Sequence, residues 1–249
     1  MARKYLFFLA GQWRDSGRPL EVINPHTREL VGVTFYASPG DLEQAIQAAE
    51  RAFEVTRKLP SYERAGFLRE MAAGITARGE EVAHTITVGA GKRSRDAIFE
   101  VERAIFTFET AAEEAKRIGG EVIPLDLQPY AKRRLGLTKR FPIGPIAGIY
   151  PFNFPLNLAA HKVAPAIASG NPLILKTPSK TPLTMLKVAE IVAGTGLPEG
   201  ALSILPMDHQ VAGNMIADDR LKMLTFTGSA SVGWSLKERA GKKKVVLEL

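Results

Sequence analysis

Asn153 carries an amide side chain directly after a predicted strand. The segment Pro145–Tyr150 has apolar and β-branched residues between turn residues, a pattern that predicts a short buried strand. Pro155 then suits the first turn of a helix, where a residue without an N–H loses no hydrogen bond. An exposed amide at the carboxyl end of a parallel strand can stabilise negative charge on a substrate oxygen. The alternative is that Asn153 only caps the helix, and taken alone this residue favours that alternative.

Two other segments could bind an anion at the same edge of a sheet. Gly228-Ser-Ala-Ser-Val-Gly233 lies between a predicted strand and a predicted helix, where free helix amides and a hydroxyl group can contact phosphate. Glycine and serine are common at helix starts, so this segment alone is weak support. Lys176 ends the neighbouring strand 172–176 and strengthens the interpretation. The usual dinucleotide signature Gly-x-Gly-x-x-Gly is absent.

Several other chemistries are excluded by the composition. The chain has no cysteine, so it has no disulfide, no thiolate metal site and no thiol nucleophile. Its four histidines have no spacing that would place two ligands on one helix face, and no metal site is expected. The segment Gly89–Ser94 contains glycines, a lysine and a hydroxyl. It is not a phosphate loop, because Ile86 stands where glycine is needed and Arg93 directly follows the lysine.

Length and charge bound the class of protein. With 249 residues, 45% of them hydrophobic, the chain can form one large domain or two small ones. The net charge of +7 does not indicate nucleic acid, because the basic residues are spread along amphipathic helices without interleaved aromatic side chains. No segment approaches the roughly 20 apolar residues of a membrane helix. Tyr5–Ala10 is too short for a signal peptide and predicts an edge strand. We expect a soluble, globular, cytoplasmic protein without nucleic-acid or membrane partners.

The amino-terminal half changes from strand to helix periodicity. The first 36 residues predict strands in an outer layer. Ser38-Pro-Gly-Asp41 begins a helix, Ser61 begins a second, and a long third helix covers about Ser94 to Ile118. The apolar stripes of these helices are Leu42, Ala45, Ile46, Ala49 and Phe53; Leu68, Met71, Ala72 and Ile75; and Ile98, Val101, Ile105, Phe108, Ala111, Ala112 and Ala115. We expect them to face the core.

A regular alternation of strands and helices follows an irregular segment. Residues 119–141 do not fit the alternation and predict a projecting two-stranded arm, which is expected to pack on something else because isolated ribbons are marginally stable. Strands are predicted near 145–150, 172–176, 201–205, 222–226 and 244–249, with helices near 155–168, 182–194, 209–217 and 229–240. This order predicts an α/β fold with a doubly wound five-stranded parallel sheet.

Five ordered motifs together resemble the amino-terminal half of an aldehyde dehydrogenase. They are Pro-Phe-Asn-Phe-Pro-Leu at 151–156, Gly-Asn-Pro at 170–172, Leu-Lys-Thr-Pro-Ser at 175–179, Phe-Thr-Gly-Ser at 226–229 and Leu-Glu-Leu at 247–249. The resemblance extends from about Phe8 to the last residue. It implies a Rossmann-like dinucleotide-binding domain formed by 1–118 and 142–249, with an amino-terminal helical layer. It also implies that 119–141 is an arm that joins subunits into a homo-oligomer.

The resemblance implies NAD or NADP as cofactor and an aldehyde as substrate of the complete enzyme. The implied cofactor contacts are Ile149, Pro151, Phe152, Lys176, Ser179, Gly228, Ser229, Val232 and Leu249, with the lysine on the adenosine ribose and Ser229 at the pyrophosphate. In the implied mechanism a cysteine thiolate attacks the aldehyde, Asn153 stabilises the oxyanion and hydride passes to nicotinamide. Glu248, activated by partial burial, then deprotonates the water that hydrolyses the thioester. Without the resemblance, Glu248 is simply a carboxylate at a solvated strand end.

The sequence departs from the resembled family at three places. Ser179 stands where the family often has an acid that binds the ribose hydroxyls, and the absence of that acid removes a barrier to NADP. Pro206–His209 stands where glycine is usual near the adenine, and Phe152 replaces the commoner tryptophan.

The catalytic cysteine of the resembled family is absent. The family's cysteine lies beyond position 249 and the chain stops inside a predicted strand, so we expect a fragment that lacks the catalytic domain and is inactive alone. One alternative is a non-catalytic nucleotide-binding or assembly module. Another is an acylating or phosphorylating semialdehyde dehydrogenase, which Glu248 disfavours because acyl transfer to coenzyme A or phosphate needs no base that activates water.

Overall fold

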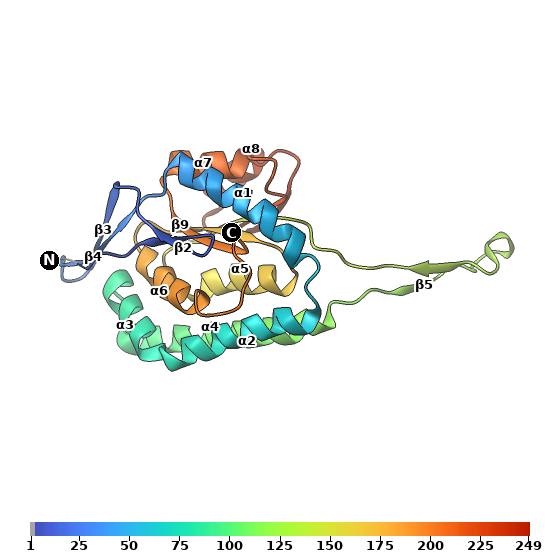
Figure 1. Cartoon of the computed structure of the whole chain (residues 1–249), viewed down its shortest axis with the longest axis horizontal. Helices are drawn as coiled ribbons and strands as arrows, with labels where there is room; N and C mark the ends of the chain where they lie inside the picture. Colours follow the sequence, from blue (N-terminus) through green and yellow to red (C-terminus); the bar gives the residue numbers. More distant parts are fainter. Residues whose placement is uncertain (1–2) are drawn as a thin grey trace.

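A computed structural model describes residues 3–249 and shows a central sheet with helices on both faces (Figure 1). The parallel strands are β7 (Ile146–Ile149), β8 (Leu173–Thr177), β9 (Leu202–Pro206), β10 (Met223–Thr227) and β11 (Lys244–Glu248). The full order is β11-β10-β7-β8-β9-β1-β2. The predicted doubly wound parallel sheet is therefore confirmed. From β7 the chain adds β8 and β9 on one side and β10 and β11 on the other, so the winding reverses between β7 and β10.

Two antiparallel strands extend this sheet beyond the prediction. β1 (Phe7–Leu9) pairs with both β9 and β2 (Gln12–Arg14). The prediction of an edge strand over Tyr5–Ala10 was wrong, because β2 covers the outer side of β1 and all of β1 is buried. The outer layer that was expected over the first 36 residues is reduced to β3 (Pro19–Ile23) and β4 (Leu30–Phe35), which form a separate pair.

The first helices begin where the sequence predicted. α1 (Pro39–Thr56) starts with a capping box in which Ser38 and Asp41 satisfy each other's backbone N–H groups. α2 (Ser61–Ala77) and α4 (Ser94–Arg117) also match the prediction.

One helix and one core residue were predicted wrongly. The sequence analysis missed α3 (Gly79–Ala90), which buries Val82, Ala83 and Ile86 and is separated from α2 only by the non-helical Arg78. Ile98, which was predicted to face the core, is 49% exposed on α4.

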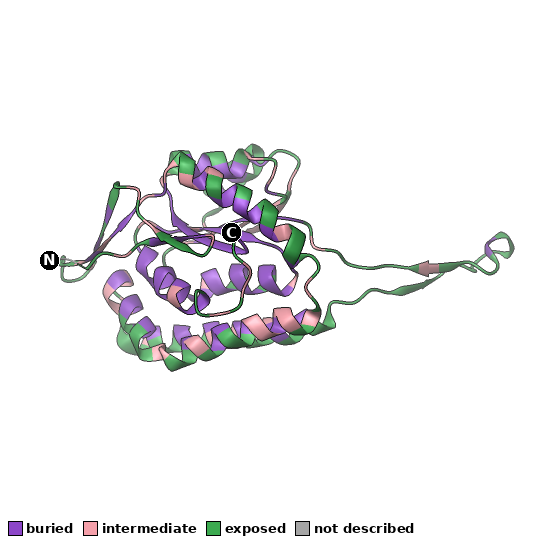
Figure 2. Cartoon of the chain, viewed as in Figure 1, coloured by how far each residue is buried: buried purple, intermediate pink, exposed green. Residues whose placement is uncertain are grey.

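The crossover helices occupy the two faces of the sheet (Figure 1). α5 (Asn157–Ala168) and α6 (Pro182–Val192) lie between the sheet and α2, α3 and α4, and both are almost completely buried (Figure 2). α7 (His209–Ala217) and α8 (Ala230–Arg239) cover the opposite face with α1. Within residues 3–249, no helix is both long and apolar enough to cross a membrane.

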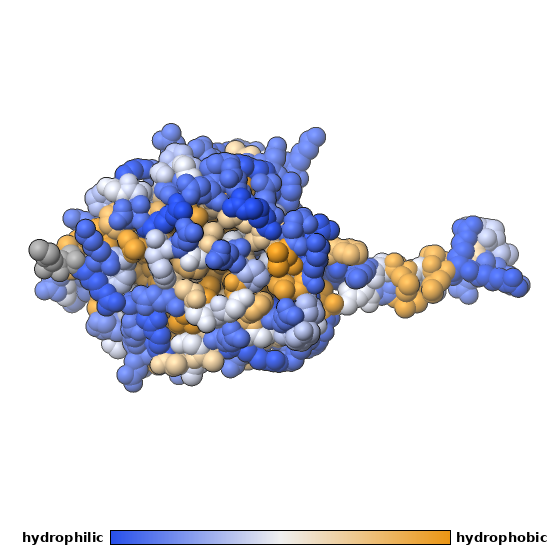
Figure 3. All heavy atoms as spheres, viewed as in Figure 1, coloured by the Kyte–Doolittle hydropathy of each residue, from blue (hydrophilic) through white to orange (hydrophobic). Residues whose placement is uncertain are grey.

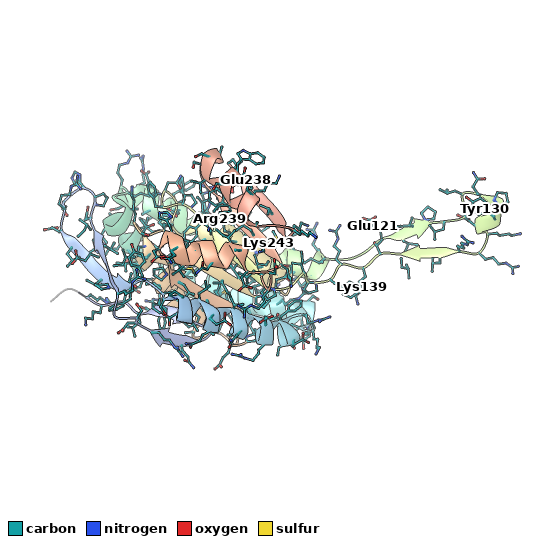
Figure 4. All side chains as sticks on the ribbon, turned by 90° about the horizontal axis from the view of Figure 1, so that it is seen from above. Glu121, Tyr130, Lys139, Glu238, Arg239 and Lys243 are labelled. Carbon is teal, nitrogen blue, oxygen red and sulfur yellow. The ribbon has the colours of Figure 1, made fainter. Side chains whose placement is uncertain are left out.

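A two-stranded arm projects from the body, as predicted (Figure 1). β5 (Val122–Pro124) and β6 (Leu135–Leu137) form its shaft, and a 3-10 turn, η1 (Pro129–Ala131), lies at its tip with Tyr130 pointing outward (Figure 4). Hydrophobic side chains surround the shaft, whereas the tip is largely hydrophilic (Figure 3). The arm therefore exposes apolar surface along much of its length.

Candidate functional site

A cleft of about 550 Å³ opens where the loops after β7 and β10 meet, at the point where the sheet's winding reverses. Doubly wound sheets bind ligands in such a crevice. The lining residues are Arg103, Pro151, Phe152, Asn153, Phe154, Asn157, Leu158, Thr227, Gly228, Ser229, Glu248 and Leu249. Seven predicted site residues therefore share one wall: Pro151, Phe152, Asn153, Gly228, Ser229, Glu248 and Leu249.

The other predicted residues lie outside this cleft. Ile149 of β7 pairs in register with Lys176 of β8 on one side and with Phe226 of β10 on the other, so Lys176 lies one strand away from the cleft. Ser179 follows β8, and Val232 is an exposed residue in the first turn of α8. Ile149, Lys176 and Ser179 lie at the carboxyl edge of the sheet. Val232 lies in α8, the helix that follows β10.

Lys176 is a half-buried cation that forms no salt bridge with any residue of the described chain. Its Nζ donates one hydrogen bond, to the carbonyl oxygen of Thr177 at 3.2 Å. Burial lowers the pKa of Lys176, and the more distant Asp208 carboxylate opposes this shift. An ammonium group has three N–H donors, so Lys176 keeps donors that a ligand could use.

The start of α8 has the properties of an anion site. Ser229 is its N-cap, but the Ser229 side chain accepts no hydrogen bond from the helix, so the first backbone N–H groups have no side-chain cap. The N–H of Gly228 is not among them, because it donates to the carbonyl oxygen of Glu248 at 3.0 Å. A Cβ at Gly228 would lie 2.4 Å from the Phe226 ring, so packing alone requires glycine there.

Asn153 is exposed in the cleft and does not cap α5. The helix starts at Asn157, two residues later than Pro155 suggested. The backbone N–H groups of Leu156 and Asn157 instead donate to Oε1 of Glu100, at 2.8 and 3.1 Å. The alternative in which Asn153 serves as helix cap is therefore wrong, and its amide is left facing the cleft.

Glu100 was missed by the sequence analysis, although a signal was present. It lies within the apolar stripe of α4 beside Ala97 and Val101, where an acid is unexpected, and it is 1% exposed. Its Oε2 accepts a hydrogen bond from Lys92 Nζ at 2.5 Å. Lys92 belongs to the rejected phosphate loop, and here it neutralises a buried carboxylate.

Glu248 is exposed, and the expected partial burial is not found. The reason is that β11 is the outermost strand of the sheet. Thr227 Oγ1 donates a hydrogen bond to Glu248 Oε2 at 3.0 Å, and Lys162 Nζ donates to the same hydroxyl at 2.8 Å. A continuous hydrogen-bond chain thus connects Lys162 with Glu248.

Lys162 was also missed. It is buried in α5, and its Nζ lies 3.3 Å from Thr225 Oγ1 as well. Burial lowers the pKa of Lys162 to about 8, and the negative charge of Glu248 partly opposes the shift. A lysine inside the mostly apolar segment 157–168 was the available signal.

The cleft adjoins a second hollow. This hollow, of about 730 Å³, shares Thr227 and Glu248 with the cleft and is mostly apolar. Among the residues that the structure describes, no group of three or more histidine, cysteine, aspartate or glutamate side chains could hold a metal ion.

The family model of the aldehyde dehydrogenase family matches residues 13–249. The 3-sulfolactaldehyde dehydrogenase of Priestia aryabhattai is 37% identical over 248 residues, which are 99% of this chain and 52% of that protein. The chain thus spans about half the length of the curated relatives it matches.

Solved structures show the same partial coverage. Aldehyde dehydrogenase 21 from Physcomitrella patens, in complex with the reaction product succinate, is 47% identical with a TM-score of 0.97, covering 100% of this chain and 52% of that chain. NADP-dependent glyceraldehyde-3-phosphate dehydrogenase from Bacillus halodurans C-125, complexed with NADP, is 30% identical with a TM-score of 0.95, covering 99% and 52%.

Proposed function

Because the chain belongs to the aldehyde dehydrogenase family, we propose that it is the cofactor-binding half of an NAD(P)-dependent enzyme that oxidises an aldehyde to a carboxylic acid. The observation that carries this proposal is the cleft at the reversal of the sheet's winding. It holds an amide donor, Asn153, and a carboxylate, Glu248, beside the uncapped start of α8. In our proposal, the remainder of the enzyme corresponds to the half of these relatives that the chain does not match.

The residues present fit a dinucleotide. Lys176 is a half-buried cation with unused donors, suited to ribose hydroxyls, and the first amides of α8 suit a pyrophosphate. Ser179 brings no negative charge against a 2′-phosphate, and Lys180 Nζ lies 4.4 Å from the centre of the Phe152 ring at the cleft. We therefore propose that NADP is accepted as well as NAD. A bound nicotinamide would supply the hydride acceptor.

Asn153 and Glu248 have separate roles in this proposal. The Asn153 amide donates a hydrogen bond to the aldehyde oxygen as negative charge develops there, and it is free to do so because Glu100 caps α5. Glu248 takes a proton from water in the hydrolytic step. Thr227 fixes the orientation of the carboxylate, and Lys162 holds Thr227. Both hydrogen bonds are donated in the direction of Glu248, so they position its carboxylate to accept the proton from water.

We propose that the polypeptide does not oxidise aldehydes alone, because the chain contains no cysteine to form the acyl intermediate. We further propose that 1–118 and 142–249 form the dinucleotide-binding domain and that 119–141 joins copies of the chain. The exposed apolar side chains along β5 and β6 support the role of the arm.

Titration calorimetry of the chain with NAD, NADP and AMP tests the cofactor proposal. All three should bind, with AMP nearly as tight as NAD because the adenosine and pyrophosphate contacts lie in this chain. Lys176→Ala should weaken all three, whereas Asn153→Ala and the surface control Lys58→Ala should not. Unchanged binding to Lys176→Ala would show that the cofactor is placed wrongly.

A further inference from the structure

We infer that the side-chain amine of Lys162 forms a Schiff base with an uncharged, apolar aldehyde that enters the hollow beside the cleft. This inference goes beyond the proposed function, because the reaction needs neither a nucleotide nor a thiolate. It gives the chain a reversible covalent binding site for aldehydes in addition to the cleft that holds Asn153.

The hollow is large enough for a small organic molecule. Its volume of about 730 Å³ falls within the range of known ligand pockets. Helices α4 and α5 and strands β10 and β11 form most of its wall, and its apolar side chains include Phe106, Ala111, Ile118, Pro165, Phe226 and Val246. Thr227 and Glu248 line both the hollow and the cleft, so the two spaces are contiguous.

Lys162 places an amine in the wall of this hollow. The residue is only 5% exposed, and its Nζ donates hydrogen bonds to Oγ1 of Thr227 at 2.8 Å and to Oγ1 of Thr225 at 3.3 Å. Lys187 is similarly buried but pairs with Glu81 at 2.8 Å, whereas Lys162 forms no salt bridge within residues 3–249. A buried cation without an ion partner is costly, so this environment favours the neutral amine.

The charge state of Lys162 suits a nucleophile. Burial lowers the pKa of Lys162 to about 8, and the Glu248 carboxylate opposes the shift. At neutral pH roughly a tenth of this amine is therefore uncharged and carries the lone pair that attacks a carbonyl carbon. Lysines that are desolvated in apolar pockets form Schiff bases for this reason. Burial also lowers the pKa of Lys176, but Lys176 does not line the hollow.

The reaction balances without an oxidant or a reductant. The neutral Nζ attacks the carbonyl carbon, so a C–N bond forms while the π bond of the carbonyl breaks. Two protons then pass from nitrogen to oxygen, and the C–O bond breaks as the oxygen leaves as water. Glu248 and His161 also line the hollow and can carry these protons. Burial lowers the pKa of His161, which favours a neutral imidazole that can accept one of them.

The lining of the hollow selects the kind of aldehyde. Its carboxylates are Glu114 and Glu248, and no arginine is among the residues that line it. An acidic substituent would therefore be repelled, whereas the rings of Phe106 and Phe226 can pack against an apolar one. An uncharged aromatic or aliphatic aldehyde fits this lining better than an acidic aldehyde.

The test uses benzaldehyde and para-carboxybenzaldehyde, each incubated with the complete 249-residue chain without nucleotide. Cyanoborohydride reduces the imine to a stable secondary amine, which peptide mass spectrometry locates and quantifies. At about pH 7 benzaldehyde should label Lys162 about tenfold more than the exposed Lys58, because a lowered pKa leaves more neutral amine. The preference for Lys162 over Lys58 should be smaller with para-carboxybenzaldehyde. It should disappear in the urea-unfolded chain, because it depends on burial.

Two neighbouring exposed residues of α4 give a matched pair of variants, since Thr110 lines the hollow and Glu109 does not. Thr110→Trp should fill the hollow and reduce labelling of Lys162 about fivefold, whereas Glu109→Trp should leave it unchanged. Labelling of Lys58 should stay the same in both, and circular dichroism checks that both are folded.

Four outcomes would each overturn the inference. They are labelling of Lys162 no greater than that of Lys58, equal preferences with the two aldehydes, equal effects of the two tryptophan variants, and a preference that persists in urea. None of these measurements involves a nucleotide, so failure of the cofactor proposal would show separately in the Lys176→Ala titrations.

Discussion

Glu100 Oε1 lies 2.8 Å from the backbone nitrogen of Leu156 and caps α5 from a different helix. Its Oε2 pairs with Lys92, so one buried carboxylate fixes the start of α5 and the loop that presents Asn153. Glu100→Ala should lower the free energy of unfolding by about 3 kcal/mol, because it leaves Lys92 and two helix N–H groups without a partner. Urea denaturation measures this. The exposed neighbour Glu102→Ala should change stability by less than about 0.5 kcal/mol, and equal effects would contradict this role of Glu100.

Lys162 should make stability depend on pH. Its pKa falls from 10.5 to about 8 on folding, so between these values the unfolded chain binds more protons than the folded chain. The free energy of unfolding therefore rises with pH in that window. The difference between wild type and Lys162→Met should increase by about 2 kcal/mol from pH 7 to pH 10. A difference between wild type and Lys162→Met that stays flat across this range would exclude a lowered pKa of Lys162.

Ser179 should govern discrimination between the two cofactors. The wild-type chain should bind NADP and NAD within about tenfold of each other, because no carboxylate faces the 2′-phosphate. Ser179→Glu should weaken NADP more than NAD through repulsion of like charges. Calorimetry with both nucleotides measures the ratio, and a ratio that Ser179→Glu leaves unchanged would place the adenosine ribose elsewhere.

The arm should drive self-association. Leu135 and Leu137 are 70% and 69% exposed on β6, and within residues 3–249 only the short β5 pairs with this strand. Replacing both leucines by serine should shift the chain toward monomer in sedimentation velocity while leaving its circular dichroism unchanged. Val55→Ser on α1 is the control for loss of an exposed apolar side chain. A wild-type chain that stays a monodisperse monomer at high concentration would contradict this prediction.

The isolated chain should not form NADH or NADPH from any aldehyde. Asn153 and Glu248 are present, but the acyl-accepting thiolate is not. Absorbance at the reduced-nicotinamide band, with a panel of aldehydes and both cofactors, measures this. Turnover that Asn153→Ala abolishes would show that another nucleophile operates in this cleft.

Most of the secondary structure was determined locally by the sequence. The capping box at Ser38, the apolar stripes of α1 and α2, and the alternation from β7 to β11 were predicted because each signal is contained within one segment. α3 was missed because only the non-helical Arg78 separates it from α2, and Gly79, which follows Arg78, is already part of α3. The sequence also suggested that ligand-binding residues lie at the carboxyl ends of the parallel strands, which share one sheet edge.

The tertiary structure alone decided how distant residues meet. β1 could be recognised as a strand, but its place between β9 and β2 depends on hydrogen bonds across about 200 residues of chain, such as Phe8 with Ile204. The contacts of Glu100 with Leu156 and of Lys162 with Thr227 join residues that are 56 and 65 positions apart. A sequence pattern identifies a charged residue on an apolar face, but packing determines whether its partner is another side chain, a helix terminus or a ligand.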